Sequence, residues 1–233
     1  MASSSAVPHI LVVDDEAQIR RVLSTCLSAQ GYLIRCADDG VDALGVMQEW
    51  PPDVVITDLG MPRMGGVELC QRIRAESQVP IIVLSVRQKE QEKVEALDAG
   101  ADDYVTKPFQ TQELLARVRA QVRRLSVQQT SGALIEAGHF KIDLETHSVL
   151  VEEREVRLTP KEFELLVYLA QHPGKVITHR KLLAAVWGDA SMEQPQYLHV
   201  FVGHLRKKLS PNGSPQQYIV TEPWVGYRFE PGE

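Results

Sequence analysis

The sequence predicts an α/β domain with a doubly wound, five-stranded parallel sheet, followed by a smaller α+β domain. The first domain is predicted because five short apolar runs alternate with five segments of helical periodicity. The second is predicted because short alternating segments are followed by three helical segments and a closing hairpin pattern. With 233 residues, the chain is long enough for two domains of ordinary size.

The expected strands of the first domain are short apolar runs, as buried parallel strands usually are. They cover residues 9–13, 33–36, 54–58, 81–84 and 104–106. Helices are expected between the strands, where apolar residues recur at spacings of three and four. The first two helices are expected to end at about residues 29 and 49, and the third to begin at residue 66. The last two are expected over 88–99 and 111–125. The first helix is expected to bury Ile19, Val22, Leu23 and Leu27.

Charged or hydroxyl side chains stand where four of these strands end. Asp14 and Asp15 follow the first strand, and Asp58 ends the third. Ser85 and Lys107 follow the fourth and fifth. Because the carboxyl ends of parallel strands meet at one edge of the sheet, we expect these side chains to share a crevice. Each position alone also fits a turn or a helix cap, but the combination favours a site.

The residue types in this crevice suit phosphoryl chemistry. Neighbouring carboxylates repel each other and favour a hard divalent cation such as Mg²⁺. An ionised Asp58 is a competent nucleophile toward a phosphoryl donor. Lys107 and Ser85 would bind phosphoryl oxygens by charge and hydrogen bonding. The sequence has no glycine-rich nucleotide-binding loop, so nucleotide binding is not predicted.

Residues 9–125 resemble the receiver domain of a two-component response regulator. The resemblance is carried by the motifs Val13-Asp14-Asp15-Glu16, Asp58-Leu59-Gly60-Met61-Pro62, Leu84-Ser85 and Lys107-Pro108-Phe109. It implies that a sensor histidine kinase phosphorylates Asp58. It also implies that Asp15, Asp58 and the Gly60 carbonyl ligate Mg²⁺ directly, while Asp14 acts through water.

The same resemblance assigns the switch residues. Ser85 is the switch hydroxyl, Tyr104 the rotating aromatic ring and Lys107 the phosphate-sensing cation. A cis peptide bond is expected before Pro108. Val86 departs from the family, which usually has a smaller residue there, and its bulk could narrow access to the phosphate.

Residues of the fourth and fifth helices resemble the dimer face of the OmpR/PhoB branch. That resemblance implies a homodimer formed on phosphorylation, with surface ion pairs that set register more than affinity. The expected pairs between subunits are Lys93–Glu113, Asp98–Arg119 and Asp103–Arg117.

A polar, small-residue connector is expected over residues 126–137, and the second domain over 138–231. Its first strands are expected at 140–144, 149–151 and 156–158. Thr159, Pro160 and Glu162 form a strong helix start, with an N-cap, a first-turn proline and a capping-box glutamate. Thr178 is expected to cap the next helix.

The third helix of this domain, about residues 196–209, is the candidate DNA-binding element. No acidic residue occurs between Gln194 and Thr221, although the net charge of the chain is −6. A helix with an apolar stripe and a basic, amide-bearing outer face suits a DNA major groove. A solvated surface helix, the alternative, would carry mixed charge.

Residues 138–230 resemble the winged-helix effector domain of the OmpR/PhoB family, through Leu158–Phe163, Leu205–Leu209 and Gly226–Phe229. The resemblance makes 196–209 the recognition helix and Glu222–Val225 the wing, and it implies promoter DNA and RNA polymerase as partners. Pro223-Trp224 replaces the usual Arg-Gly, and Trp224 is expected on the sugar-phosphate backbone. The expected DNA-binding residues are Gln196, His199, Val200, Gly203, His204, Arg206, Lys207 and Trp224.

Further motifs are similar to the Kdp potassium-uptake branch of this family. They are Val186-Trp187-Gly188, Tyr197-Leu198, Gly203-His204-Leu205-Arg206, Asp58-Leu59-Gly60 and the run from Ala96 to Tyr104. The resemblance therefore implies control of potassium-uptake genes.

Composition favours a cytoplasmic protein. No apolar run reaches the roughly 20 residues that span a bilayer, and no secretory signal is present. Cys26, Cys36 and Cys70 form no CxxC pair and are expected to be buried, reduced thiols.

Two other functions remain open from sequence. An aspartate-nucleophile phosphatase or phosphotransferase would need a second acid where Gly60 stands. A receiver whose second domain binds protein or RNA would not need an acid-free helix. We therefore expect a transcriptional regulator whose only catalysis is phosphorylation and dephosphorylation of itself.

Overall fold

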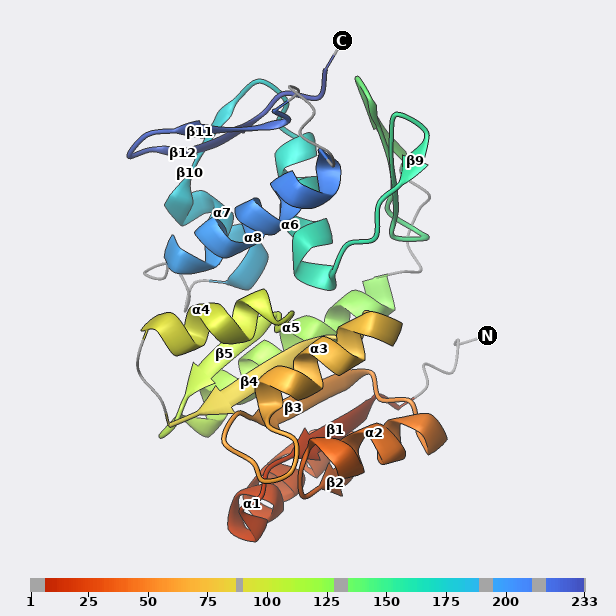
Figure 1. The fold of residues 1–233 in the computed structure, drawn as a ribbon, viewed down its shortest axis with the longest axis vertical. Helices are drawn as coiled ribbons and strands as arrows, with labels where there is room; N and C mark the ends of the chain where they lie inside the picture. Colours follow the sequence, from red (N-terminus) through yellow and green to blue (C-terminus); the bar gives the residue numbers. More distant parts are fainter. Residues whose placement is uncertain (1–6, 87–89, 128–133, 189–194, 211–216, 233) are drawn as a thin grey trace. The chain divides into compact units, whose positions relative to one another are not determined.

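The computed structural model describes residues 7–86, 90–127, 134–188, 195–210 and 217–232 (Figure 1). The chain divides into two compact units, residues 1–127 and 128–233, and each unit is described by itself. The predicted fold class is confirmed, with a parallel five-stranded α/β unit followed by a winged-helix α+β unit. Within the described ranges, no helix is long and apolar enough to cross a membrane.

The first unit is a parallel sheet with the strand order β2-β1-β3-β4-β5. Its strands are β1 His9–Val13, β2 Leu33–Ala37, β3 Val54–Asp58, β4 Ile81–Ser85 and β5 Asp103–Thr106. Its helices are α1 Ala17–Ser28, α2 Gly40–Glu49, α3 Gly66–Glu76, α4 Glu90–Asp98 and α5 Thr111–Val127. From β1, the chain first builds the sheet to one side with β2 and then to the other side with β3, β4 and β5. Sheets of this kind bind ligands beyond the carboxyl ends of the strands, at the point where the strand order reverses.

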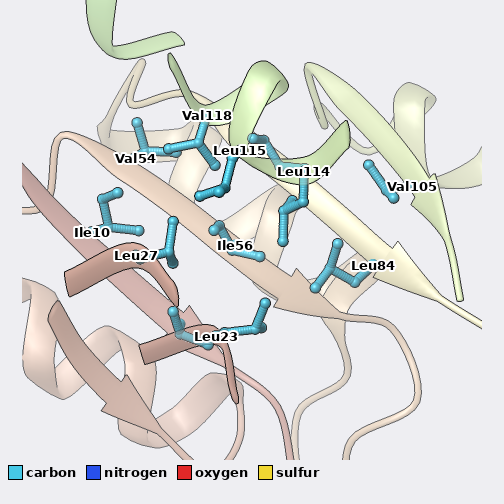
Figure 2. Packing of buried hydrophobic residues seen from close by; sticks show 12 residues of the cluster. Ile10, Leu23, Leu27, Val54, Ile56, Leu84, Val105, Leu114, Leu115 and Val118 are labelled. Atoms are coloured by element: carbon cyan, nitrogen blue, oxygen red, sulfur yellow. The ribbon is translucent and has the colours of Figure 1, made fainter. Parts of the chain in front are cut away.

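The core between the sheet, α1 and α5 is built from aliphatic side chains (Figure 2). Leu23 and Leu27 of α1 pack with Leu114 and Val118 of α5 against the buried strands. Val22 was expected in this core, but its side chain is 50% exposed. At 100° per residue, position 22 falls beside the face centred on Leu23 and Leu27, so the prediction for Val22 is wrong.

Two close backbone approaches hold the start of α3 beside the end of β3. The Gly66 amide donates to the Leu59 carbonyl at 3.1 Å. A Cβ on Gly66 would lie 2.1 Å from the backbone oxygen of Asp58. The helix can therefore begin this close to Asp58 only because residue 66 has no side chain.

In its described residues, the second unit has two small antiparallel sheets and three helices. One sheet contains β6 Leu134–Ala137, β7 Phe140–Asp143, β8 Ser148–Val151 and β9 Arg154–Glu155. The other has the order β10-β12-β11, from β10 Val176–Thr178, β11 Ile219–Glu222 and β12 Gly226–Phe229. The helices are α6 Pro160–Ala170, α7 His179–Trp187 and α8 Pro195–Leu209.

The first sheet of this unit differs from the sequence prediction in two places. Residues 134–137, expected in the connector, form β6 and pair with β7. The strand expected at 156–158 is instead β9 at 154–155. Glu152 and Glu153 both have positive φ and form a two-residue hairpin turn, which fixes Arg154 opposite Val151. Turn geometry, rather than the apolar alternation after it, therefore sets this strand.

The helix starts predicted for this unit are confirmed. Thr159 and Glu162 form a capping box at α6, with Pro160 in the first turn. The Thr178 side chain accepts from the Lys181 amide at the start of α7. Both caps satisfy amide donors that a helix leaves unpaired at its first turn.

The close approach at Gly66 gives the first prediction. Gly66→Ala should destabilise the first unit, because the added methyl group meets the Asp58 backbone. Gly45→Ala is the matched control, since Gly45 lies within α2 with nothing within 4 Å of an added Cβ. The control should raise the free energy of unfolding by about 0.5–1 kcal/mol. Urea unfolding of the full chain measures both, and equal effects would contradict this view of the β3–α3 junction.

Candidate functional site

The Lys107 ammonium joins the ends of β1, β3 and β5 in one buried cluster. It donates to Asp14 Oδ2 at 2.7 Å and to Asp58 Oδ1 at 2.6 Å. All three side chains are buried. The structure therefore brings together three of the residues predicted to share the crevice, although they lie far apart in the sequence.

The other carboxylate oxygens of this cluster accept hydrogen bonds from the backbone. Asp14 Oδ1 accepts from the Glu16 amide at 2.9 Å. Asp58 Oδ2 accepts from the Gly60 amide at 2.5 Å. The loops after β1 and β3 thus orient the two carboxylates, while Lys107 supplies the positive charge between them.

The pKa of Lys107 reflects this arrangement. Burial alone would lower it, but the hydrogen bonds to Asp14 and Asp58 and the charges of both carboxylates outweigh burial. The net result is a raised pKa, so Lys107 stays charged at neutral pH. A charged ammonium can bind the oxygens of an anionic group such as a phosphoryl group.

Ser85 and Tyr104 lie on the neighbouring strands, and both are buried. The Ser85 carbonyl accepts from the Lys107 amide at 2.7 Å, which fixes the backbone of Lys107 beside the end of β4. The Tyr104 ring is already inside the domain, and the Lys93 ammonium lies 5.8 Å from its centroid. The expected cis peptide bond before Pro108 is present. Val86, which follows Ser85, is 67% exposed to solvent.

The donor set of the cluster suits magnesium. Asp14 and Asp58 offer carboxylate oxygens, which Mg²⁺ prefers, and Asp15 is exposed next to them. Among the described residues, no three metal-ligating side chains already converge on one point. In this structure the charge of Asp14 and Asp58 is balanced by Lys107 instead.

Arg63 is a residue near this site that the sequence reasoning missed. It lies in the loop after Asp58 with a φ of 55°. Its guanidinium pairs with Asp39, the N-cap of α2, and donates to Asp42 Oδ2 at 2.8 Å. The Arg63 side chain therefore ties the Asp58 loop to α2. Two acids in the first turn of a predicted helix were the available signal for a basic partner.

One pair expected between subunits is formed within the chain. Arg117 Nη1 donates to both carboxylate oxygens of Asp103, at 2.8 and 2.9 Å. Arg117 Nη2 also donates to Glu113 Oε1 at 2.9 Å, and Arg117 and Asp103 are buried. Asp98 and Arg119 are exposed. One nitrogen of the Arg117 guanidinium thus binds Asp103 while another binds Glu113, because the guanidinium carries donors on several nitrogens.

In the second unit, α8 has the apolar stripe that the sequence predicts. The buried residues are Tyr197, Leu198, Phe201, Val202, Leu205 and Leu209. His199 and Lys207 are exposed, while Gln196, Val200 and Gly203 are partly exposed. These five positions recur at spacings of three and four, so they form one outward face.

Two expected DNA contacts, Arg206 and His204, point toward neighbouring elements instead. Arg206 Nη2 donates to the Ile219 carbonyl and to Thr221 Oγ1, both at 2.7 Å. His204 Nδ1 lies 3.6 Å from Glu162 Oε1 of α6. Both residues flank the outward face, where their side chains reach β11 and α6. The helical wheel gives the face of a residue but not what packs beside that face.

Trp224 stands in the turn between β11 and β12. Its side chain is 98% exposed and its φ is 67°. A left-handed backbone is unfavourable for a bulky residue, and an exposed indole gains nothing from burial. The wing therefore presents a large aromatic surface to solvent at a cost to stability.

Cys36 is exposed, which corrects the expectation that all three thiols are buried. Cys70 is buried and Cys26 is intermediate, and all three are free. Cys36 lies on β2, the edge strand of the sheet, where alternate side chains face solvent.

Comparisons with known proteins define the class. Residues 10–119 match the response regulator receiver domain. Residues 153–229 match the C-terminal domain of transcriptional regulatory proteins. A receiver joined to such a domain makes a phosphorylation-dependent transcriptional regulator rather than a classical enzyme.

Curated relatives narrow this class. The chain is 45% identical over 222 residues to the transcriptional regulatory protein KdpE of Mycobacterium tuberculosis, covering 95% of this chain and 98% of that protein. It is 42% identical over 221 residues to the KDP operon transcriptional regulatory protein KdpE of Escherichia coli, with the same coverage. The chain belongs to the KdpE family of transcriptional regulatory proteins.

Solved structures that match across both units agree with this fold. The Thermotoga maritima OmpR/PhoB homologue DrrB is 33% identical, with a TM-score of 0.51. A mutant of RitR is 27% identical, with a TM-score of 0.76. Each comparison covers 96% of this chain and 99% of the other. The OmpR/PhoB assignment from sequence is confirmed.

The histidines beside α8 give a pH prediction. The His179 and His199 rings lie 6.0 Å apart, and burial, then the charge of His199, lowers the pKa of His179 below 6.5. The unfolded chain then binds this proton more tightly, so the stabilisation is present above pH 6.5 and is lost as the pH falls through the lower folded pKa.

His179→Gln should flatten that loss in the unfolding free energy of the second unit. Urea titrations of the full chain between neutral and mildly acidic pH measure it. His172→Gln controls for the removal of a histidine outside this pair. An unchanged pH profile in His179→Gln would refute the role of this imidazole.

Proposed function

We propose that the chain is the response regulator of a potassium-uptake two-component system and that Asp58 accepts the phosphoryl group. The supporting observation is the position of Asp58, at the carboxyl end of β3 with its carboxylate held by Lys107 and the Gly60 amide. An Asp58 oxygen attacks phosphorus as the P–N bond of a kinase phosphohistidine breaks, which gives an acyl phosphate. The name of the Escherichia coli relative, KDP operon transcriptional regulatory protein KdpE, supports potassium-uptake genes as the target.

Receiver domains use Mg²⁺ at the phosphorylation site. In this chain Asp14, Asp15, Asp58 and the Gly60 carbonyl would hold it, and the ion would supply charge neutralisation for the incoming phosphoryl group. Lys107 already lies between Asp14 and Asp58, so its ammonium can follow the added negative charge. Ser85 adds a hydroxyl donor from the end of the neighbouring strand.

Phosphorylation would reach the rest of the receiver through Tyr104 and the α4–β5–α5 face. Tyr104 is next to Asp103, and Asp103 is clamped by Arg117 of α5. A homodimer on this face would use Lys93–Glu113 and Asp98–Arg119 between subunits. The internal Asp103–Arg117 pair then positions Glu113, which Arg117 also binds. Asp103 and Arg117 would pair between subunits only if this internal ion pair first separated.

Promoter DNA is the proposed target of the second unit. Gln196, His199, Val200, Gly203 and Lys207 would face the major groove from α8. Trp224 would pack on the sugar-phosphate backbone, and two subunits would occupy direct-repeat half-sites. RNA polymerase is a further proposed partner, and the cytoplasm, where promoter DNA lies, is the proposed location.

Three of the four domain bounds predicted from sequence are kept in this proposal. The receiver covers residues 9–125, and the DNA-binding domain ends at residue 231. Since β6 pairs with β7, we propose that the DNA-binding domain begins at Leu134 rather than at 138.

Asp58→Asn should abolish the acid-labile, base-labile phosphoryl label that acetyl phosphate and Mg²⁺ introduce. The amide is a poor nucleophile, so position 58 can no longer form an acyl phosphate. Asp53→Asn is the matched control, because Asp53 precedes the same strand at its opposite end. Its side chain accepts a hydrogen bond from the His9 amide. Persistent labelling of Asp58→Asn at the wild-type level would sink the assignment of the phospho-acceptor.

Lys107→Met tests the charge balance of the pocket. With Mg²⁺ chelated, removing the cation from two buried carboxylates should lower the unfolding free energy of the first unit by about 3–5 kcal/mol. Added Mg²⁺ should recover more stability in Lys107→Met than in the wild type, because it replaces the missing charge.

Lys141→Met is the control, since Lys141 is an exposed partner of Glu153 in the other unit. Thermal unfolding with and without Mg²⁺ measures all three chains. If Lys107→Met is as stable as the wild type in chelator, the ammonium is not the cation that balances Asp14 and Asp58.

A further inference from the structure

We propose that Arg206 is a positioning residue, which fixes the wing to the recognition helix rather than contacting DNA. Its three hydrogen bonds to the β11–β12 hairpin would set where Trp224 stands relative to the outward face of α8. The inference rests on the proposed role of α8 and the wing in DNA binding, and it assigns to Arg206 a part in that binding.

The contacts of Arg206 hold the first strand of the hairpin. Nε and Nη2 donate to the Ile219 carbonyl at 2.9 and 2.7 Å. Nη2 also donates to Thr221 Oγ1 at 2.7 Å. The guanidinium therefore spans two residues on one side of β11. Lysine has no planar fork and cannot reproduce this set of bonds.

The second strand of the hairpin is held from α8 as well. The Arg206 guanidinium lies 6.0 Å from the centroid of the Tyr227 ring. His199 Nδ1 lies 2.9 Å from the Tyr227 hydroxyl. Thr221 and Tyr227 are direct partners across the β11–β12 ladder. Two side chains of α8 thus grip a single cross-strand pair of the hairpin.

The wing turn begins directly after this gripped pair. Glu222 pairs with Gly226, and the Val225 amide donates to the Glu222 carbonyl at 3.1 Å to close the turn. The His179 amide donates to the Val225 carbonyl at 3.0 Å, which ties the turn to α7. Trp224, at the tip of the turn, has an exposed side chain and a left-handed backbone conformation. These contacts anchor the residues on both sides of the turn, and they would hold the unfavourable backbone conformation of Trp224 in place.

The rival role for Arg206 is a direct phosphate contact, and salt dependence separates the two. The probe is one fixed, labelled duplex that the wild-type chain has selected from a random library, and binding is followed by anisotropy. If Arg206 positions the wing, Arg206→Gln and Arg206→Lys should both weaken binding about tenfold. Neither substitution should change the slope of affinity against salt.

Lys207→Gln is the matched control from the neighbouring, exposed position. It should reduce the salt slope by about 0.9, the change for one lost phosphate contact. Thr221→Val is a second variant that removes one acceptor without altering any charge. It should weaken binding in the same direction as Arg206→Gln with an unchanged slope, which keeps the test valid if Arg206→Gln folds poorly.

A double-mutant cycle with Trp224→Ala then tests the coupling. In the Trp224→Ala background, Arg206→Gln should cause little further loss of affinity. By contrast, the fold-losses of affinity caused by Lys207→Gln and Trp224→Ala should multiply in the double variant. The inference is overturned if Arg206→Lys restores wild-type affinity, if Arg206→Gln lowers the slope, or if its effect multiplies with that of Trp224→Ala. A wild-type chain that binds no duplex would overturn the proposed function itself, and the inference with it.

Discussion

The ammonium of Lys107 is the contact on which the receiver depends. Two buried, ionised carboxylates repel each other unless a cation lies between them, and the Lys107 ammonium donates to both Asp14 and Asp58 within 2.7 Å. This contact links the ends of β1, β3 and β5, so a change of charge at Asp58 would act directly on Lys107 at the end of β5. Tyr104 and Asp103 lie on that strand, and the Asp103–Arg117 pair connects it to α5. The proposed chemistry and the proposed signal would therefore begin from one ion pair.

The same division of labour recurs in the second unit. Residues that would meet the partner, such as Lys207 and Trp224, are exposed, while the partly buried Arg206 makes contacts with the hairpin that carries Trp224. Arg206 holds the hairpin, as Arg63 holds the loop after Asp58. In both units an arginine with several bonds to acceptors supports a group that carries the function, which suits the planar guanidinium.

Much of the fold and of the candidate phosphorylation pocket could be predicted from sequence, because both depend on periodic patterns. Apolar runs that end in Asp14, Asp58 and Lys107 give strands, and parallel strands bring their carboxyl ends to one edge. The partners of long side chains could not be predicted. A helical wheel places Arg206 and His204 near the outward face but does not reveal β11 and α6 beside them. Likewise β9 is set by the positive φ of Glu152 and Glu153, which apolar alternation does not report.

The most direct measurement of the account is the chemical position of the phosphoryl group. The full chain is phosphorylated with acetyl phosphate and Mg²⁺ and reduced with borohydride, which converts an aspartyl phosphate to homoserine. Its peptides are then sequenced by mass spectrometry. The account predicts homoserine at position 58 alone. Homoserine at position 14 or 15, or an unreduced Asp58 in a chain that carries the label, would contradict it.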